Sequence, residues 1–429
     1  MNRLLYIILS LLFMPFGSEQ LMAQSDSLSH YLEVAAQNNP GIRAAYQNYQ
    51  ASLQQIPQAG ALPDLQLDMG FYAQPMDIID GKQVADFTLM QMFPWFGARK
   101  AARNEAEHMS DVAFEQYRES LDNLYLDVYT QWYELASLKQ KLNNLDEHRG
   151  FLKQLEELAI RRFSTSSGND GEMSSTLRVR LESVELDNEV EKTIADMESG
   201  KARFNALLNR SSDAVIVLPD SVEELMFVLD VASAMEQISA QSPALKMIMQ
   251  EQNAYKAKAE SDKKASMPMI GVGLQYSLIN KRSGEVLPVT SMNGMDMWMP
   301  MVSVSLPIWR GKYKAQQKQS QYYHAASAAR YNDTYNNLQA ELVQLKHRLE
   351  NSRRTLGLLE KQSNLALTTY NLVVREFATG KSTLNDVIEV QRQLLDYRLR
   401  RSDAIAEYNT QVAEAQKLIS FNANNIQQR

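Results

Sequence analysis

The residues with the most evident chemical potential are two acids near the end of the chain. Asp386 and Glu389 are three residues apart, so on a helix they share one face. They stand in the first turn of a predicted helix, where the helix dipole favours negative charge. Two interpretations follow: the acids stabilise the helix start, or they form an acidic site with a function of its own.

Methionines form the second candidate group. Met292, Met295, Met297, Met299 and Met301 follow one another closely, and we group Met267 and Met269 with them. Thioether sulfur is a suitable ligand for Cu(I). Methionine is also a flexible apolar filler, so packing or lipid contact is the alternative interpretation.

The rest of the composition argues against an enzyme. The histidines are scattered along predicted helices without an HExxH pair, and we interpret each as a solvated helix residue: His30, His108, His148, His324 and His347. With no cysteine, the chain cannot form disulfides, thiolate metal sites or a lipidated N-terminal cysteine. The net charge of −7, without a basic block, makes nucleic acid an unsuitable partner. We therefore expect no catalytic residue and no cofactor.

An internal repeat organises the elements that carry these residues. Pro94-Trp95-Phe96-Gly97 ends an apolar, strand-like run and begins a very long helix pattern, and Pro307 to Gly311 does the same 214 residues later. The helix patterns stay in phase at this offset, which indicates a duplication. In the second copy, residues at alternating spacings of three and four form a coiled-coil stripe: Leu338, Leu342, Leu345, Leu349, Ser352, Leu356, Leu359, Ser363, Ala366, Tyr370, Val373 and Phe377. The equivalent stripe of the first copy runs from Leu124 to Phe163.

The N-terminus has the pattern of a secretory signal. Arg3 precedes an apolar run of about ten residues, and Leu21-Met22-Ala23 offers a cleavage site, so we expect residues 1–23 to be removed. The alternative is a membrane anchor helix, but the run is short of the ~20 residues that span a bilayer.

Five segments follow from these patterns: the signal (1–23), a first repeat (24–209), a linker (210–231), a second repeat (232–420) and a C-terminal tail (421–429). Each repeat is predicted as helix, strand, loop, strand, very long helix and return helix. In the first repeat we expect helices at 26–56, 97–163 and 172–209, strands at 64–74 and 84–93, and a loop at 75–83. The first helix is expected to break at Asn39-Pro40 and to be ended by Pro57 and Pro63. In the second we expect helices at 232–266 (broken at Ser242-Pro243), 311–377 and 382–420, strands at 268–278 and 298–308, and a loop at 279–297.

The strands have the length and alternation of tilted membrane strands. A small soluble sheet is the alternative, but the adjacent helices are too long to cover it. Four strands cannot close a barrel, and an open sheet edge is not tolerated in lipid. Three chains would supply twelve strands. Each long helix would reach about 100 Å and pack against two shorter helices placed end to end, with the linker as a belt partway along.

These features together resemble the TolC family of outer-membrane efflux ducts. Asn39-Pro40 and Ser242-Pro243 fall at the family's repeated helix break, and Pro94–Gly97 and Pro307–Gly311 match its strand-to-helix junctions. The segment from Phe377 to Glu389 looks like the family's periplasmic tip. The resemblance implies a mainly α fold with a membrane β-barrel: long coiled-coil hairpins plus four strands per chain, closing in a homotrimer as a 12-stranded barrel and a 12-helix tunnel.

The same resemblance implies a location and partners. The chain would lie in the outer membrane of a Gram-negative bacterium, extend into the periplasm, and dock on a periplasmic adaptor protein and an inner-membrane pump. Asp386 and Glu389 would form a ring of carboxylates at the pore constriction, and crowded acids of this kind select cations. The methionines would suit the copper and silver type of exporter. The alternative for the whole chain is a secreted or periplasmic coiled-coil structural or adhesion protein.

The adaptor-docking tips are expected at the two hairpin ends, where glycine and serine interrupt the helices. Their predicted residues are Phe163, Gly168, Phe377, Gly380, Lys381 and Ser382. The first copy departs from the tip pattern, because its turn is longer and either Gly168 or Gly171 could replace Gly380. Glu172 is therefore only a weak counterpart of the acidic ring.

Overall fold

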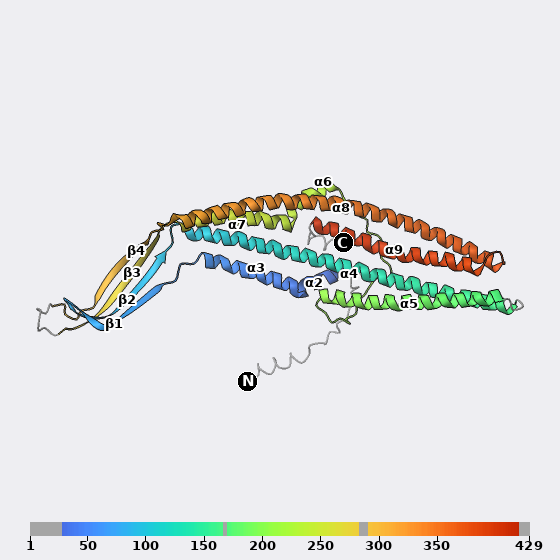
Figure 1. Ribbon diagram of the computed structural model, residues 1–429, viewed down its shortest axis with the longest axis horizontal. Helices are drawn as coiled ribbons and strands as arrows, with labels where there is room; N and C mark the ends of the chain where they lie inside the picture. Colours follow the sequence, from blue (N-terminus) through green and yellow to red (C-terminus); the bar gives the residue numbers. More distant parts are fainter. Residues whose placement is uncertain (1–27, 166–169, 283–290, 420–429) are drawn as a thin grey trace, which may run out of the picture.

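The computed structural model describes residues 28–165, 170–282 and 291–419. The predicted signal at 1–23, the tail at 421–429 and Gly168 lie outside these residues. The molecule is elongated, with a four-stranded sheet at one end and helices that run away from it to two hairpin ends (Figure 1). The first half contains α2(Leu28–Asn38), α3(Pro40–Ala59), β1(Gln66–Ile78), β2(Gly81–Phe93), α4(Ala98–Thr165) and α5(Asp170–Leu207). The second contains α6(Val231–Gln241), α7(Pro243–Ala265), β3(Met269–Asn280), β4(Met297–Ser305), α8(Arg310–Ala378) and α9(Leu384–Leu418).

Both predicted helix breaks are confirmed. The Asn39 side chain accepts hydrogen bonds from the backbone N–H groups of Gly41 and Ile42, at 2.8 and 3.2 Å. Pro40 then occupies the first helical turn, where no backbone donor is needed. Asn39 also donates to the Leu207 carbonyl at 2.9 Å, which ties this break to the end of α5. Of the two prolines predicted to end this helix, Pro57 lies inside it, since α3 continues to Ala59, and the helix stops before Pro63.

The two long helices form the frame of the molecule. Helix α4 has 68 residues and α8 has 69, so each spans about 100 Å. As predicted, α4 packs along α3 and α5, and α8 along α7 and α9 (Figure 1). The predicted stripe of α8 is largely buried, through Leu342, Leu345, Leu349, Ser352, Leu356, Leu359, Ala366 and Phe377. Helix α4 also packs against α7 and α9, so the two halves form one body.

The linker forms the predicted belt partway along the helices. The Tyr31 ring packs against Trp132 and Phe204, with centroid distances of 5.3 and 5.1 Å, and its hydroxyl accepts a hydrogen bond from the Val217 backbone. Farther along the linker, the Leu225 N–H donates to the Asn409 side chain of α9 at 2.9 Å. The belt therefore joins both halves where the shorter helices meet.

The sheet is antiparallel, in the order β1-β2-β3-β4. The predicted loop at 75–83 is wrong: β1 and β2 extend into it and leave only a two-residue turn at 79–80. Pro75 is accommodated because β1 is an edge strand with a register shift between Phe71 and Met76, and edge strands tolerate proline. Strand β4 ends at Ser305 instead of residue 308, just before Pro307, which has no backbone donor for the ladder.

Candidate functional site

One face of the sheet is apolar and uncovered. The register places residues of all four strands side by side on this face, for example Leu67, Leu89 and Leu274, and Tyr276 beside Trp298. Many of its side chains are open to the surroundings, and Phe71 and Val302 are 73% and 74% exposed. We call this the apolar face: Leu67, Met69, Phe71, Phe87, Leu89, Phe93, Ile270, Val272, Leu274, Tyr276, Leu278, Trp298, Val302 and Val304. A face of this size requires a hydrophobic environment.

The opposite face of the sheet is polar. Asp86 of β2 lies at its centre and accepts hydrogen bonds from the Tyr72 hydroxyl of β1 and the Ser277 hydroxyl of β3, each at 2.6 Å. Gln83 donates to the same carboxylate. This division into an apolar and a polar face is the pattern of a barrel strand with lipid on one side and water on the other.

Among the residues that the structure describes, neither edge of the sheet is paired with a further strand. Strand β1 has β2 as its neighbour and β4 has β3, so each of these end strands presents one free row of backbone groups. Free edges readily accept another strand. The sheet is thus complementary to further copies of itself.

The α8–α9 hairpin end is a rigid turn. Gly380 adopts φ +78°, a conformation that favours glycine. Thr383 begins α9 with a capping box, in which its hydroxyl accepts from the Asp386 N–H while the Asp386 carboxylate accepts from the Thr383 N–H. Phe377 is 4% exposed and packs with Leu384 in the core of the hairpin end. Its ring therefore positions the turn, and only its neighbours can offer side chains to a partner.

The predicted tip residues differ in what they present. Lys381 is exposed and Ser382 is half-buried, with the Ser382 hydroxyl donating to Asp386 at 3.0 Å. Phe163 lies within α4 and Glu172 within α5, near the other hairpin end. The two hairpin ends lie side by side at the end of the molecule opposite the sheet (Figure 1).

The two candidate constriction acids have different surroundings. Hydrogen bonds from Thr383 and Ser382 hold the pKa of Asp386 below its usual range. Asp386 thus has the helix-start role that was one of the two interpretations. Glu389 is exposed and makes no hydrogen bond or ion pair with the described residues. Their role as a pore constriction stays a prediction.

Ion pairs between the hairpins are functional candidates that sequence reasoning missed. Arg392 of α9 forms hydrogen-bonded ion pairs with Glu182 of α5 and lies 3.4 Å from Glu185. Arg398, on the same helix, pairs with Glu147 of α4 at 2.7 Å. Partners about 210 and 251 positions apart leave no spacing signal in the sequence.

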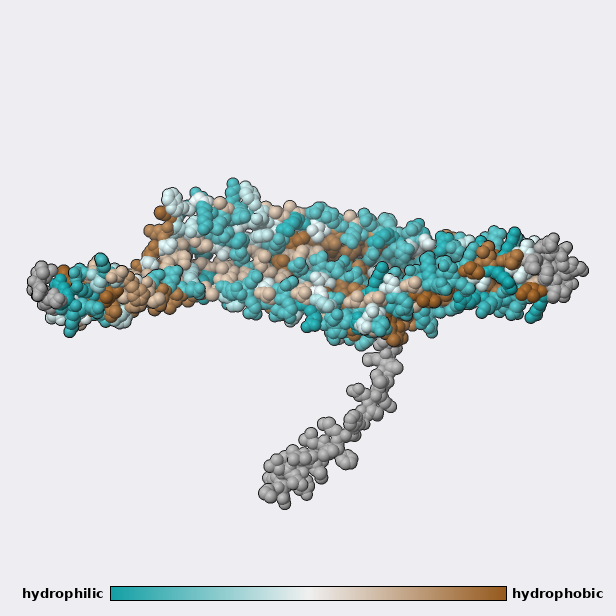
Figure 2. Space-filling view, turned by 60° about the horizontal axis from the view of Figure 1, so that its bottom comes forward, coloured by the Kyte–Doolittle hydropathy of each residue, from teal (hydrophilic) through white to brown (hydrophobic). Residues whose placement is uncertain are grey.

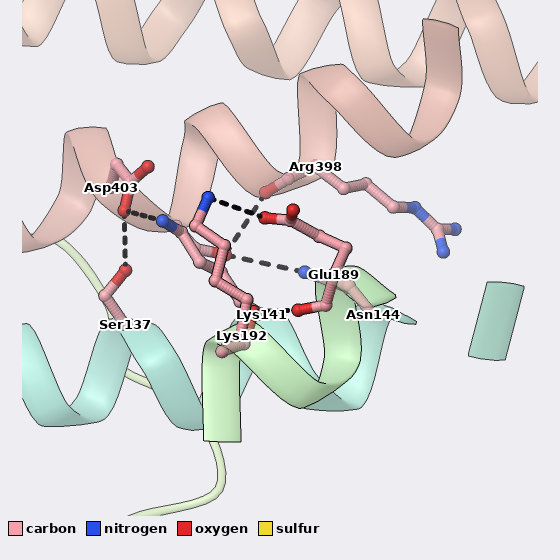
Figure 3. Close-up of polar contacts among 9 residues, drawn as sticks. Ser137, Lys141, Asn144, Glu189, Lys192, Arg398 and Asp403 are labelled. Carbon is pink, nitrogen blue, oxygen red and sulfur yellow. Dashed lines mark hydrogen bonds and ion pairs between the residues drawn. The ribbon is translucent and has the colours of Figure 1, made fainter. Parts of the chain in front are cut away.

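A second polar junction between α4 and α9 lies farther from the hairpin ends (Figure 3). Asp403 of α9 forms an ion pair with Lys141 at 2.6 Å and accepts a hydrogen bond from the Ser137 hydroxyl at 3.1 Å. Asn144 lies within 3.5 Å of the Ser402 hydroxyl. These contacts fix the second half of the chain against the first.

One histidine contradicts its prediction as a solvated residue. His148 is 7% exposed, on the face of α4 that packs into the hairpin. Burial lowers the pKa of its imidazole to about 4, although Glu182 and Glu147 act in the opposite direction. It is therefore a neutral core residue at physiological pH.

The four predicted metal-candidate methionines are all exposed. Met297 and Met299 lie on the polar face of β4, and Met292 and Met295 lie in the segment before it. The described residues contain no group of His, Cys, Asp or Glu that could hold a metal ion. The methionine site stays a prediction. Among the described helices, none is both long and apolar enough to cross a bilayer.

This architecture, a sheet with one lipid-type face joined to helices of about 100 Å, defines a class of channel protein of the bacterial outer membrane. Residues 234–419, almost the whole second repeat, match the family model described as outer membrane efflux protein. The second repeat therefore matches this family, and the chain as a whole resembles the TolC-type channels.

Solved structures show the same fold over nearly the whole chain. VceC from Vibrio cholerae is 15% identical, with a TM-score of 0.74, covering 91% of this chain and 95% of its own. The open-state MtrE outer membrane channel of Neisseria gonorrhoeae is 16% identical, with a TM-score of 0.71 and coverages of 91% and 88%. CusC, whose structures concern folding and transmembrane channel formation, is 14% identical, with a TM-score of 0.74 and 92% coverage of both chains. A search of curated proteins found no match.

Proposed function

We propose that three copies of this chain form a passive duct that carries cargo out of the cell through the periplasm and the outer membrane. The observation that carries the proposal is the sheet, whose apolar face is uncovered and whose two edges are free. In lipid every backbone polar group must be paired, so an open sheet must close. Three sheets of four strands supply an even-numbered barrel of common size.

The helices continue the same duct below the membrane. In three copies, the helices that leave the sheet would surround a common axis, and the hairpin ends would lie farthest from the membrane. A duct of this kind needs no catalytic residue: its partner pump supplies the energy. A secreted coiled-coil scaffold is the alternative, but it would not account for the uncovered apolar face of the sheet.

The oligomeric state tests this proposal directly. Mass measurement of the purified protein, corrected for bound detergent, should give three chains per particle. The purified particle should also open stable conductances in a planar lipid bilayer. A particle that stays a stable monomer in detergent would contradict both the barrel and the tunnel.

The hairpin ends are the proposed contact with the adaptor. The α8–α9 turn offers exposed Thr379, Gly380 and Lys381 on a rigid, capped backbone. Because the chain has no native cysteine, a Thr379→Cys variant can be crosslinked selectively in cells. It should crosslink to the periplasmic adaptor, whereas a Ser303→Cys control on the polar face of the sheet should not. Crosslinks from the control alone would reverse the orientation.

A further inference from the structure

A pocket lies where the sheet meets the helices. It has a volume of about 590 Å³, and its apolar wall is formed by Leu62, Phe93, Phe96 and Ile270. Phe93 and Ile270 belong to the apolar face, directly opposite each other on β2 and β3. Figure 2 shows hydrophobic residues gathered at this junction. The pocket is therefore continuous with the surface that the barrel turns toward lipid.

The same pocket also carries two cations. Arg99 and Lys100, in the first turn of α4, complete its lining. Gly97, with φ +81°, turns the chain sharply between the strand and the helix and so brings these charges beside the aromatic residues. The Arg99 Nε donates to the Gly60 carbonyl at 2.8 Å. This bond holds the guanidinium in place and leaves its terminal nitrogens available.

These two cations lack acidic partners among the described residues. Their neighbours Arg103 and Lys258 form ion pairs with Glu107 and Glu105, whereas Arg99 and Lys100 form none. No acid lies in the first turn of α4. The uncompensated charge is thus local to the pocket.

The surrounding helix ends are also strongly basic. The segments 98–104, 256–265 and 310–318 contain eleven Lys and Arg against two acidic residues, although the whole chain has a net charge of −7. The fold brings the ends of α4, α7 and α8 together at the sheet (Figure 1). A positive ring beside a membrane attracts anionic lipids.

We propose that this pocket binds an anionic phospholipid from the membrane leaflet that faces the helices. The inference rests on the proposed function, because it requires the sheet to lie in the membrane. An acyl chain would lie along Leu62, Phe93, Phe96 and Ile270, and the phosphate would contact Arg99 and Lys100. Arginine is well suited to phosphate through its fork of donors. A soluble anion would make no use of the apolar wall as a contact surface. An uncharged apolar ligand would leave the two cations without a partner.

Native mass spectrometry of the detergent-solubilised protein tests the pocket. The probe is dioleoyl-phosphatidylglycerol, with dioleoyl-phosphatidylcholine as the zwitterionic comparison. We expect bound phosphatidylglycerol to exceed phosphatidylcholine. The Arg99→Gln/Lys100→Gln variant should lower the phosphatidylglycerol affinity about tenfold or more, because each basic residue near a membrane surface contributes appreciably. Phe96→Ser should weaken the binding of both lipids, since Phe96 is 81% exposed and its loss removes apolar contact.

A matched control separates local from general effects. Arg353→Gln/Arg354→Gln removes an adjacent, exposed basic pair in the middle of α8, far from the sheet, and should leave lipid binding unchanged. Inorganic phosphate should not displace the lipid; displacement by phosphate would identify the site as one for free anions.

The remaining outcomes are also distinguishable. Equal lipid binding by the wild type and the Arg99/Lys100 variant, with the trimer intact, would overturn the pocket proposal alone. Loss of the trimer in that variant would mean that a neighbouring chain covers the pocket, which would also overturn it. A wild-type protein that forms neither trimers nor channels would instead contradict the proposed function.

Discussion

His148 and Asp122 are both buried on α4. A fall in pH changes the stability of the folded chain through these two residues in opposite directions. Burial lowers the pKa of His148 from 6.5 to about 4. Burial also raises the pKa of Asp122 from 3.8 to about 6, which Arg118 and Lys417 only partly oppose. In each case the folded chain favours the neutral form, which is the basic form of histidine and the acidic form of aspartate.

The sign of each effect follows from proton linkage. Below pH 6.5 the unfolded chain protonates His148 while the folded chain does not, so stability falls as the pH drops toward about 4. Between pH 3.8 and about 6 the folded chain holds the Asp122 proton more tightly, so stability falls as the pH rises. The two contributions oppose each other in the range that they share.

We predict that His148→Leu removes the acid-side loss. Lowering the pH from 6.5 to 4.5 should cost the wild type about 2 kcal/mol more unfolding free energy than the variant. Urea unfolding followed by the helical circular dichroism signal at both pH values measures this difference. The comparison uses each protein's own pH dependence, so a packing loss in the variant does not matter. Equal pH dependence would mean that Glu182 and Glu147, which raise the pKa of the ring, compensate its burial.

Replacing Asp122 should have the opposite signature. Asp122→Asn removes the carboxylate that is forced to ionise in a buried position above about pH 6. The variant should therefore gain about 2 kcal/mol relative to the wild type between pH 4 and pH 7. The same urea titrations measure it. A relative loss at pH 7 would show that ionised Asp122 is stabilised in the assembled protein, for example by Lys417.

Glu389 separates the pore hypothesis from helix capping. Asp386 is engaged in the capping box, so replacing it changes the turn as well as the charge. Glu389 has no such bond among the described residues. We predict that Glu389→Gln lowers the cation selectivity of channels in planar bilayers while trimer yield is unchanged. The control is Glu360→Gln, which changes one exposed carboxylate of α8. Equal selectivity in all three proteins would place the constriction elsewhere.

At the scale of the elements, the sequence correctly predicted the features that depend on a local pattern of residues. The stripe of α8 was readable because its apolar residues recur at spacings of three and four, and Leu342 and Leu345 are almost fully buried as expected. The break at Asn39 was readable because asparagine before proline is a strong helix start. The turn at 79–80 could not be predicted, because Pro75 and Gly81 suggested a longer loop. Only the register between β1 and β2 shows that the strands extend up to this turn.

The contacts between elements could not be predicted in the same way. Burial of His148 depends on how α4 packs within the hairpin, and its sequence neighbours Glu147 and Arg149 suggest an exposed position. The partners of Arg392 come from another helix. A single sequence contains the spacing within a helix, but not the pairing between helices that are far apart in the chain.

The pairing of Arg392 with Glu182 and Glu185 holds the two hairpins together near their ends. We predict that Arg392→Ala loosens this junction and raises single-channel conductance in planar bilayers, because the hairpin ends can then move apart. Arg400→Ala is the matched control, since Arg400 pairs only with Asp396 of its own helix among the described residues. If both variants conduct like the wild type, the ion pair does not restrict opening.

At the scale of the whole molecule, closure of the sheet decides the function. In the described part of the chain, β1 and β4 each lack a second neighbour, and a membrane sheet with free edges is unfavourable. The pairing of one chain's β4 with the next chain's β1 would satisfy both edges at once. Such head-to-tail contacts either close into a ring or continue without limit. The number of chains in the closed ring is thus a measurable consequence of the strand pairing.

Cysteine pairs can count these junctions, because the chain has no native cysteine. We predict that Val302→Cys on β4, combined in turn with a cysteine at each residue of β1, forms disulfides between neighbouring chains for at least one pair. Non-reducing gels should then show covalent dimers and trimers and nothing larger, since a closed barrel of three chains contains only three junctions. Leu89→Cys/Leu274→Cys is the control: these residues face each other on β2 and β3 of one chain, so their disulfide should leave a monomer on the gel. A ladder that continues beyond three chains would mean that the sheets join into an open array, and a complete lack of crosslinks from β1 would mean that β4 pairs with something else.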